Sequence, residues 1–245
     1  MDSLQVTFFP TESQINEIEK WLIEEKRVTG HSFYCNWNLI KSSFDNNQIA
    51  IISYRERPVG FATWWMSTEK TARIEIAEIE PSYRKKGIGK RLTTVLLDFL
   101  LDKGIYVVDL QCAPESSEPI WKRLGFIEFA PTEGYRFDNH SNKRLYKILT
   151  KYLQPSSSTN SIETIELWNN EPYMASKNTT PTHIWNLEFI PGTRILSEPI
   201  VIPGHYKWRL QWKRNGEIFK DGQVRYFGTK IDFRDFIIID QLPLA

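Results

Sequence analysis

The sequence contains few of the residues on which disulfide-rich, metal-binding or membrane proteins depend. Two of its 245 residues are cysteine (Cys35 and Cys112) and four are histidine, too few for a disulfide framework or a zinc set. No apolar run approaches the length of a membrane-spanning helix, and the N-terminus lacks the apolar segment of a secretory signal. We therefore expect a soluble, cytoplasmic protein with no metal and no membrane partner.

An excess of charge of either sign is also missing. Residues 1–150 hold 20 basic and 20 acidic side chains, and residues 151–245 hold the remaining 11 and 10. Proteins that bind nucleic acid usually carry a clear excess of positive charge in the binding domain. The sequence therefore argues against a nucleic-acid partner.

The feature that organises the chain is a basic, glycine-containing turn between a strand and a helix. Residues 73–80 are rich in strand-forming side chains and end at Pro81, which cannot continue a sheet ladder. The turn, residues 84–90, reads Arg-Lys-Lys-Gly-Ile-Gly-Lys. Apolar residues then recur at helical spacing on one face, namely Ile88, Leu92, Val95, Leu96, Phe99 and Leu100. Gly104 is a typical residue to end that helix.

Such a turn is suited to phosphate. The first N–H groups of a helix have no partner in the helix and carry partial positive charge, so they converge on anions. Gly87 and Gly89 would let the backbone approach a bulky diphosphate closely. The bland alternative is an ordinary tight turn with a solvated basic face.

Two sequence motifs favour the phosphate-binding interpretation, because they resemble motifs of a known protein family. The turn resembles the R/Q-x-x-G-x-G/A motif of the GNAT N-acetyltransferase superfamily, and residues 79–84 are similar to that family's V-x-P-x-Y-R lead-in. Residues 120–126, Ile-Trp-Lys-Arg-Leu-Gly-Phe, resemble its second signature. The resemblance covers roughly residues 3–150 and implies that backbone amides hold the pyrophosphate of acetyl-CoA. The residues it predicts to bind the cofactor are Ile79, Arg84, Lys85, Lys86, Gly87, Ile88, Gly89, Lys90 and Trp121.

Acetyl transfer to an amine also needs a base, because an aliphatic amine is almost fully protonated at neutral pH. A positioned base contributes about 10²–10⁴ in rate. Glu78, on the strand before the turn, and Asp109, on the next strand, are the two candidates; each has the alternative of being a solvated or salt-bridged strand residue. The resemblance gives the backbone N–H of Ile79 the role of stabilising the negative charge on the thioester carbonyl.

One residue departs from the family pattern. The tyrosine that commonly protonates the departing thiolate is Trp121 here, and an indole N–H has no useful acidity. Tyr34, Tyr83, Tyr135 or solvent would replace it. Cys112 reads as a buried thiol rather than as a nucleophile.

The predicted fold class is α+β, with a GNAT-like acetyltransferase fold followed by a small all-β domain. We expect the first domain in residues 1–153, a polar linker in residues 154–161, and an antiparallel sandwich or barrel in residues 162–245. Strands are predicted at residues 162–168, 185–190, 206–213, 223–227 and 233–239, with hairpin turns at Asn215-Gly216 and Asp221-Gly222.

The sequence thus predicts an acetyl-CoA-dependent N-acetyltransferase that acts on a primary amine by direct attack in a ternary complex. The alternative is a non-catalytic acyl-CoA sensor with a partner-binding β domain. A homodimer formed through that domain is a further expectation. The sequence leaves the identity of the amine open.

Overall fold

The computed structural model describes residues 4–130, 143–174, 180–227, 231–232 and 235–243. Its contacts divide the chain into two units, which are described separately. The first consists of residues 1–128 and 140–149, and the second of residues 129–139 and 150–245.

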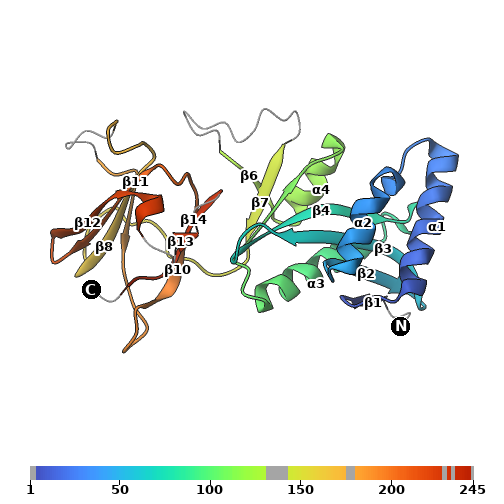
Figure 1. Cartoon of the computed structure of the whole chain (residues 1–245), viewed down its shortest axis with the longest axis horizontal. Helices are drawn as coiled ribbons and strands as arrows, with labels where there is room; N and C mark the ends of the chain where they lie inside the picture. The colour runs from blue at the N-terminus through green and yellow to red at the C-terminus, as the bar shows by residue number, and fades with distance from the viewer. Residues whose placement is uncertain (1–3, 131–142, 175–179, 228–230, 233–234, 244–245) are drawn as a thin grey trace. The chain divides into compact units, whose positions relative to one another are not determined.

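The first unit is a seven-stranded sheet with helices on both faces (Figure 1). Its elements are β1 (Leu4–Thr7), α1 (Glu12–Thr29), α2 (Trp37–Asp45), β2 (Ile49–Tyr54), β3 (Arg57–Met66), β4 (Thr71–Ile79), α3 (Ile88–Asp102), β5 (Val107–Gln111), α4 (Glu118–Arg123), β6 (Ile127–Glu128) and β7 (Arg144–Ile148). The strand order is β1-β2-β3-β4-β5-β7-β6, and among these described strands only β4 and β5 pair in parallel. The predicted α+β fold class is confirmed for this unit.

Helix α1 begins and ends where its sequence predicts. Thr11 and Gln14 form a capping box, and Gly30 ends the helix in the left-handed conformation. The buried face of α1 packs with α2, β2 and β3 in a core cluster on one side of the sheet. Side chains that recur every three or four residues form this face, namely Ile15, Ile18, Trp21 and Leu22.

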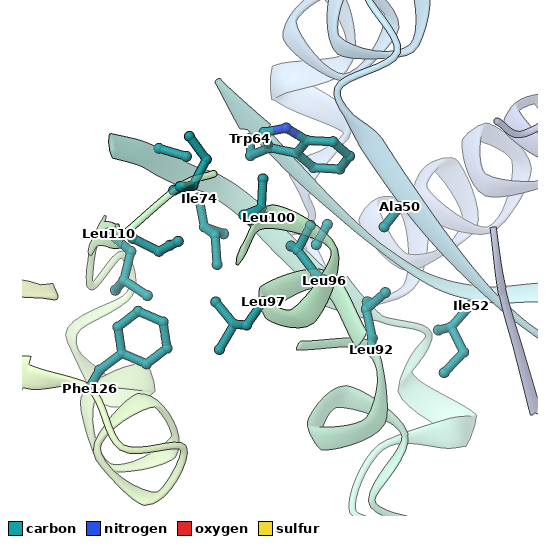
Figure 2. Close-up of a cluster of buried hydrophobic side chains, with 14 of the residues drawn as sticks. Ala50, Ile52, Trp64, Ile74, Leu92, Leu96, Leu97, Leu100, Leu110 and Phe126 are labelled. Atoms are coloured by element: carbon teal, nitrogen blue, oxygen red, sulfur yellow. The ribbon is translucent and has the colours of Figure 1, made fainter. Parts of the chain in front are cut away.

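Helix α3 covers the other side of the sheet. Leu92, Leu96, Leu97 and Leu100 point into a core that also contains Trp64, Ile74, Leu110 and Phe126 (Figure 2). Burying one such leucine stabilises the fold by about 1.5–3 kcal/mol, so this face holds α3 firmly against the sheet. The turn that precedes α3 is therefore fixed at the end of β4.

The two central strands separate part of the way along β4. Pairing with β5 runs only from Thr71 to Ile74, whereas pairing with β3 continues to Ile79. The register between β3 and β4 shifts at Glu75, which is the extra residue of a β-bulge, and a bulge bends its strand. We call residues 75–79 the open edge of β4, because β5 does not pair with them.

The second unit contains β-strands and no α-helix in the part that the structure describes. Its elements are β8 (Glu163–Trp168), β9 (His183–Asn186), β10 (Ile195–Pro203), β11 (Arg209–Arg214), β12 (Glu217–Gln223), β13 (Ile231–Asp232) and β14 (Phe236–Gln241). They form a four-stranded sheet, β12-β11-β8-β9, and a three-stranded sheet, β10-β14-β13. Side chains from both sheets share one apolar core, so the unit is a sandwich rather than a barrel.

Three details of the second unit differ from their predictions. Asn215-Gly216 is the β11–β12 turn, as predicted, but Asp221-Gly222 lies inside β12. Residues 224–226 form a 3-10 turn instead of a strand, and β10 was not predicted.

The predicted linker, residues 154–161, is hydrogen-bonded to the second unit, since Ser156 N–H donates to the Ile184 carbonyl at 2.7 Å. We propose a domain boundary near residue 150.

Candidate active site

The turn before α3 exposes a row of backbone donors. Lys85 and Gly87 have φ of 61° and 77°, in the left-handed region that costs a side chain about 1–2 kcal/mol. The first backbone hydrogen bond of α3 runs from Arg91 N–H to the Gly87 carbonyl at 3.1 Å, and no side chain caps the helix. The N–H groups of residues 88–90 precede that bond, so they are available to an anion.

All three lysines of this turn are exposed, and one of them, Lys86, folds back onto the turn. Lys86 Nζ donates to the Ser82 carbonyl at 2.8 Å and lies 5.1 Å from the ring centre of Tyr83. Lys85 and Lys90 are exposed beside the N–H groups. Their charges therefore face solvent at the helix N-terminus.

Arg84 is placed differently from the lysines. Its Nε donates to the Ile79 carbonyl at 2.8 Å. Its Nη2 contacts Glu78 Oε1 at 2.9 Å and also Glu25 Oε1 of α1. The guanidinium of the motif thus bridges two carboxylates and the end of β4 instead of pointing at the N–H groups of the turn.

Glu78 lies at the open edge of β4, and one of its two carboxylate oxygens already accepts hydrogen bonds. Oε1 accepts from Arg84 and from the Ile79 N–H at 2.9 Å, whereas no described residue donates to Oε2. Burial raises the pKa of the Glu78 carboxyl above its ordinary value; the Arg84 charge and the Ile79 N–H oppose this rise, and the charge of Glu25 adds to it. A carboxylate with a raised pKa and a lone pair to spare is suited to accept a proton.

The Ile79 N–H points away from β3. Glu80 N–H donates to the Val59 carbonyl on β3 at 2.9 Å, and successive N–H groups of a strand point to opposite sides. The N–H of Ile79 therefore faces the side of β4 where β5 no longer pairs with it. In this structure the carboxylate of Glu78 accepts its hydrogen bond.

Gly60 of β3 fixes the position of Ile79. A Cβ at Gly60 would overlap the Ile79 side chain and stand 2.9 Å from the Glu78 carbonyl. We expect Gly60→Ala to lower stability by about 1–3 kcal/mol and to lower activity as well, because Ile79 must shift. Thermal unfolding measures the first effect; Gly222→Ala in β12, where a Cβ meets nothing within 4 Å, is the control. An unchanged melting temperature for Gly60→Ala would contradict the prediction.

Asp109 is not placed as an available base. Its side chain is 6% exposed and accepts from Arg73 Nη2 and from Arg144 Nη2, both at 2.6 Å. These contacts join β4, β5 and β7. Of the two alternatives that the sequence left open for Asp109, the salt-bridged strand residue is the one that the structure favours.

Trp121 and the tyrosines proposed to replace it as proton donor have different neighbours in the structure. Trp121 is half-buried on α4 and packs edge-on against Phe126 at 5.3 Å. Tyr83 lies on the turn after β4 and packs against Tyr54, and Tyr34 stacks on Trp37 near α1. Tyr135 lies outside the described residues.

The thiol of Cys112 lies apart from this arrangement. Cys112 is fully buried in the core beneath α3, and burial raises the pKa of its thiol, so it is not an activated nucleophile. Among the described residues no three His, Cys, Asp or Glu side chains gather as metal ligands. None of the helices described there is long and apolar enough to cross a membrane.

Sequence reasoning missed Glu25, although its position carried a signal. Glu25 lies seven residues after Ile18 and three after Leu22, on the buried face of α1. Its side chain is only 8% exposed. An acidic residue on an apolar face is rarely buried without a partner, and here the partner is Arg84.

Comparisons with known proteins identify relatives of the first part of the chain. A model of the acetyltransferase (GNAT) family matches residues 12–126. An uncharacterized N-acetyltransferase from Methanocaldococcus jannaschii is 31% identical over 111 residues, which are 42% of this chain and 48% of that protein; the chain thus spans about half the length of the curated relative it matches.

Solved structures resemble the first part of the chain. Ard1 from Thermoplasma volcanium is 18% identical, with a TM-score of 0.47 over 60% of this chain and 99% of that one. The PaiA N-acetyltransferase from Thermoplasma acidophilum, in complex with coenzyme A, is 17% identical, with a TM-score of 0.47 and the same coverage. From the family match, the order of the elements and the turn before α3, residues 12–126 are a domain of the GNAT acetyltransferase family.

Proposed function

We propose that the chain transfers an acetyl group from acetyl-CoA to a primary amine within a ternary complex. The observation that carries the proposal is the position of Glu78, whose carboxylate has an uncommitted oxygen beside the open edge of β4. The donors of the turn before α3 lie at the end of the same strand. The N–H groups proposed to bind the cofactor and the proposed base therefore lie on one short segment of the chain.

The pyrophosphate of acetyl-CoA would bind the N–H groups of residues 88–90. At Gly89 the φ is ordinary and a Cβ would stand 3.5 Å from the Ile79 side chain, an ordinary contact. The fold therefore does not require glycine there, and the missing side chain leaves the backbone open to a bulky diphosphate. Lys85 and Lys90 add positive charge, whereas Arg84 is engaged with Glu25 and Glu78. The backbone, rather than the motif arginine, therefore supplies the main contacts to the diphosphate.

In the transfer itself Glu78 accepts a proton from the ammonium form of the acceptor, and the neutral amine nitrogen then attacks the thioester carbonyl carbon. The carbonyl oxygen gains negative charge and would be stabilised by the Ile79 N–H. The carbon–sulfur bond then breaks as the nitrogen releases its second proton to solvent, giving an amide and the thiolate of CoA. That thiolate has an ordinary thiol pKa near ~8.5 and takes its proton from solvent, since Trp121 cannot donate one.

Binding of the cofactor is testable by thermal unfolding. At a concentration about 100 times Kd, acetyl-CoA should stabilise the protein by about 2.7 kcal/mol, or about 5–10 °C. We expect Gly87→Val combined with Lys86→Glu to abolish this shift, because the new side chain and charge occupy the anion site. Gly104→Val is the matched control, since Gly104 has φ of 81° and open space around it at the other end of α3. Absence of a shift in the unsubstituted protein would remove the basis of the proposal.

A second function has one observation in its favour, the tryptophan at position 121. Without the tyrosine that usually protonates the thiolate, the domain could bind acyl-CoA and serve as a sensor, with the second unit as the partner-binding module. Release of CoA thiol across a panel of amines separates the two functions. Turnover with any amine would exclude the sensor, and binding without turnover would favour it.

A further inference from the structure

We propose that Glu25 binds the acceptor, its carboxylate holding the ammonium group of an aliphatic primary amine next to Glu78. This inference rests on the proposed function and names the class of its substrate. Glu25 would be a specificity-determining residue contributed by α1, outside the two motifs that bind the cofactor.

The first argument is the uncommitted oxygen of Glu25. Oε1 accepts from Arg84, but Oε2 is buried and has no hydrogen-bond partner in the described structure. A buried carboxylate oxygen without a donor costs about 1–3 kcal/mol or more. A ligand that supplies N–H donors to this oxygen would remove that cost.

The second argument is proximity. Glu25 and Glu78 contact the same nitrogen of Arg84, so the two carboxylates lie side by side. Glu25 Oε2 is buried without a partner, and the hydrogen bonds described for Glu78 both reach its Oε1. An ammonium group has three N–H donors and can therefore contact both carboxylates while its carbon chain leaves the site.

The third argument is charge. Arg84 balances one of the two carboxylates, which leaves an excess of one negative charge among these three side chains. Arg84, from the turn before α3, and Glu25, from α1, are the charged groups that shift the pKa of Glu78. One ammonium ion neutralises the excess, and after its proton passes to Glu78 the remaining pair, Glu25 and Arg84, stays balanced. The site thus selects an amine that arrives as a cation.

The test compares two acceptors of the same shape. One is the best aliphatic primary amine from the panel, and the other is its aminooxy isostere, in which oxygen replaces the methylene next to nitrogen and which is uncharged at pH 7. In the full chain, we expect Glu25→Gln to raise KM for the aliphatic amine about 10- to 100-fold, since a hydrogen bond to a charged group contributes about 1.5–3 kcal/mol. KM for the isostere should change less than twofold.

A pH profile adds a second readout, which reports the charge of Glu25 at Glu78. The charge of Glu25 raises the pKa of Glu78, so Glu25→Gln should shift the acid limb of kcat/KM to lower pH. Glu24→Gln is the control, because Glu24 is exposed and pairs with Arg27. Glu25→Asp keeps the charge and should recover part of the selectivity.

The outcomes are distinct. If the unsubstituted protein acetylates no amine, the proposed function fails. If it does, and Glu25→Gln alters KM for both acceptors equally or not at all, only the role of Glu25 is overturned. If Glu25→Gln and Glu25→Asp both fail to fold, the two acceptors are compared with the unsubstituted protein alone. A lower KM for the aliphatic amine than for its isostere then supports the proposal, and a higher one overturns it.

Discussion

Replacing Glu78 by glutamine should lower kcat about 10²–10⁴-fold, the contribution of a positioned base, and should leave binding of acetyl-CoA unchanged. Glutamine keeps the shape of the side chain and an oxygen for the Ile79 N–H, but it cannot accept the proton of the amine. Steady-state kinetics with the best acceptor measures kcat. Calorimetry with CoA measures binding separately.

The matched control is Glu75→Gln. Glu75 is on the same strand, is exposed, and marks the bulge, so its charge should have little effect on turnover. The unsubstituted protein should lose activity as pH falls through the pKa of Glu78, which burial raises above its ordinary value, because the base acts only when deprotonated. An acid limb that persists in Glu78→Gln would assign that titration to another group.

Replacing Asp109 by asparagine should instead destabilise the first unit by about 3–5 kcal/mol, the cost of breaking a buried ion pair by removing one partner. The change leaves two guanidinium groups, of Arg73 and Arg144, without the carboxylate that they share. Thermal unfolding should show a fall on the order of 10 °C. Asp98→Asn on the exposed side of α3 is the control and should stay within about 0.5 kcal/mol.

The two substitutions together separate chemistry from stability. Below its own unfolding transition, Asp109→Asn should retain most of its turnover, whereas Glu78→Gln should be stable and inactive. The opposite pattern, in which Asp109→Asn is folded but inactive while Glu78→Gln remains active, would exchange the roles assigned to these residues.

Local patterns predicted the first unit well because its elements have strong local signals. The capping box of Thr11 with Gln14 sets where α1 begins, and the turn with its two glycines sets where α3 begins. The separation of β4 from β5 had no such signal. It depends on the bulge at Glu75 and on the pairing of β5 with β7, which are contacts between distant parts of the chain.

The second unit shows the same limit more clearly. Asn215-Gly216 formed the predicted turn because both residues accept positive φ, but the similar pair Asp221-Gly222 is held extended, with Asp221 bound to Arg209 of the neighbouring strand. At the candidate site, the position of Arg84 in the turn could be predicted, and its partners could not. Those partners come from α1 and β4, which only the folded structure brings together.

The hydrogen bond from the Ile79 N–H to Glu78 has a kinetic consequence. One donor has two possible acceptors, the carboxylate next to it and the oxygen of an incoming thioester. That bond lowers the pKa of Glu78, so its transfer to the thioester would make the carboxylate a stronger base only once the acyl donor is seated. Catalysis would then follow a compulsory sequence, with acetyl-CoA loading before the amine can be deprotonated.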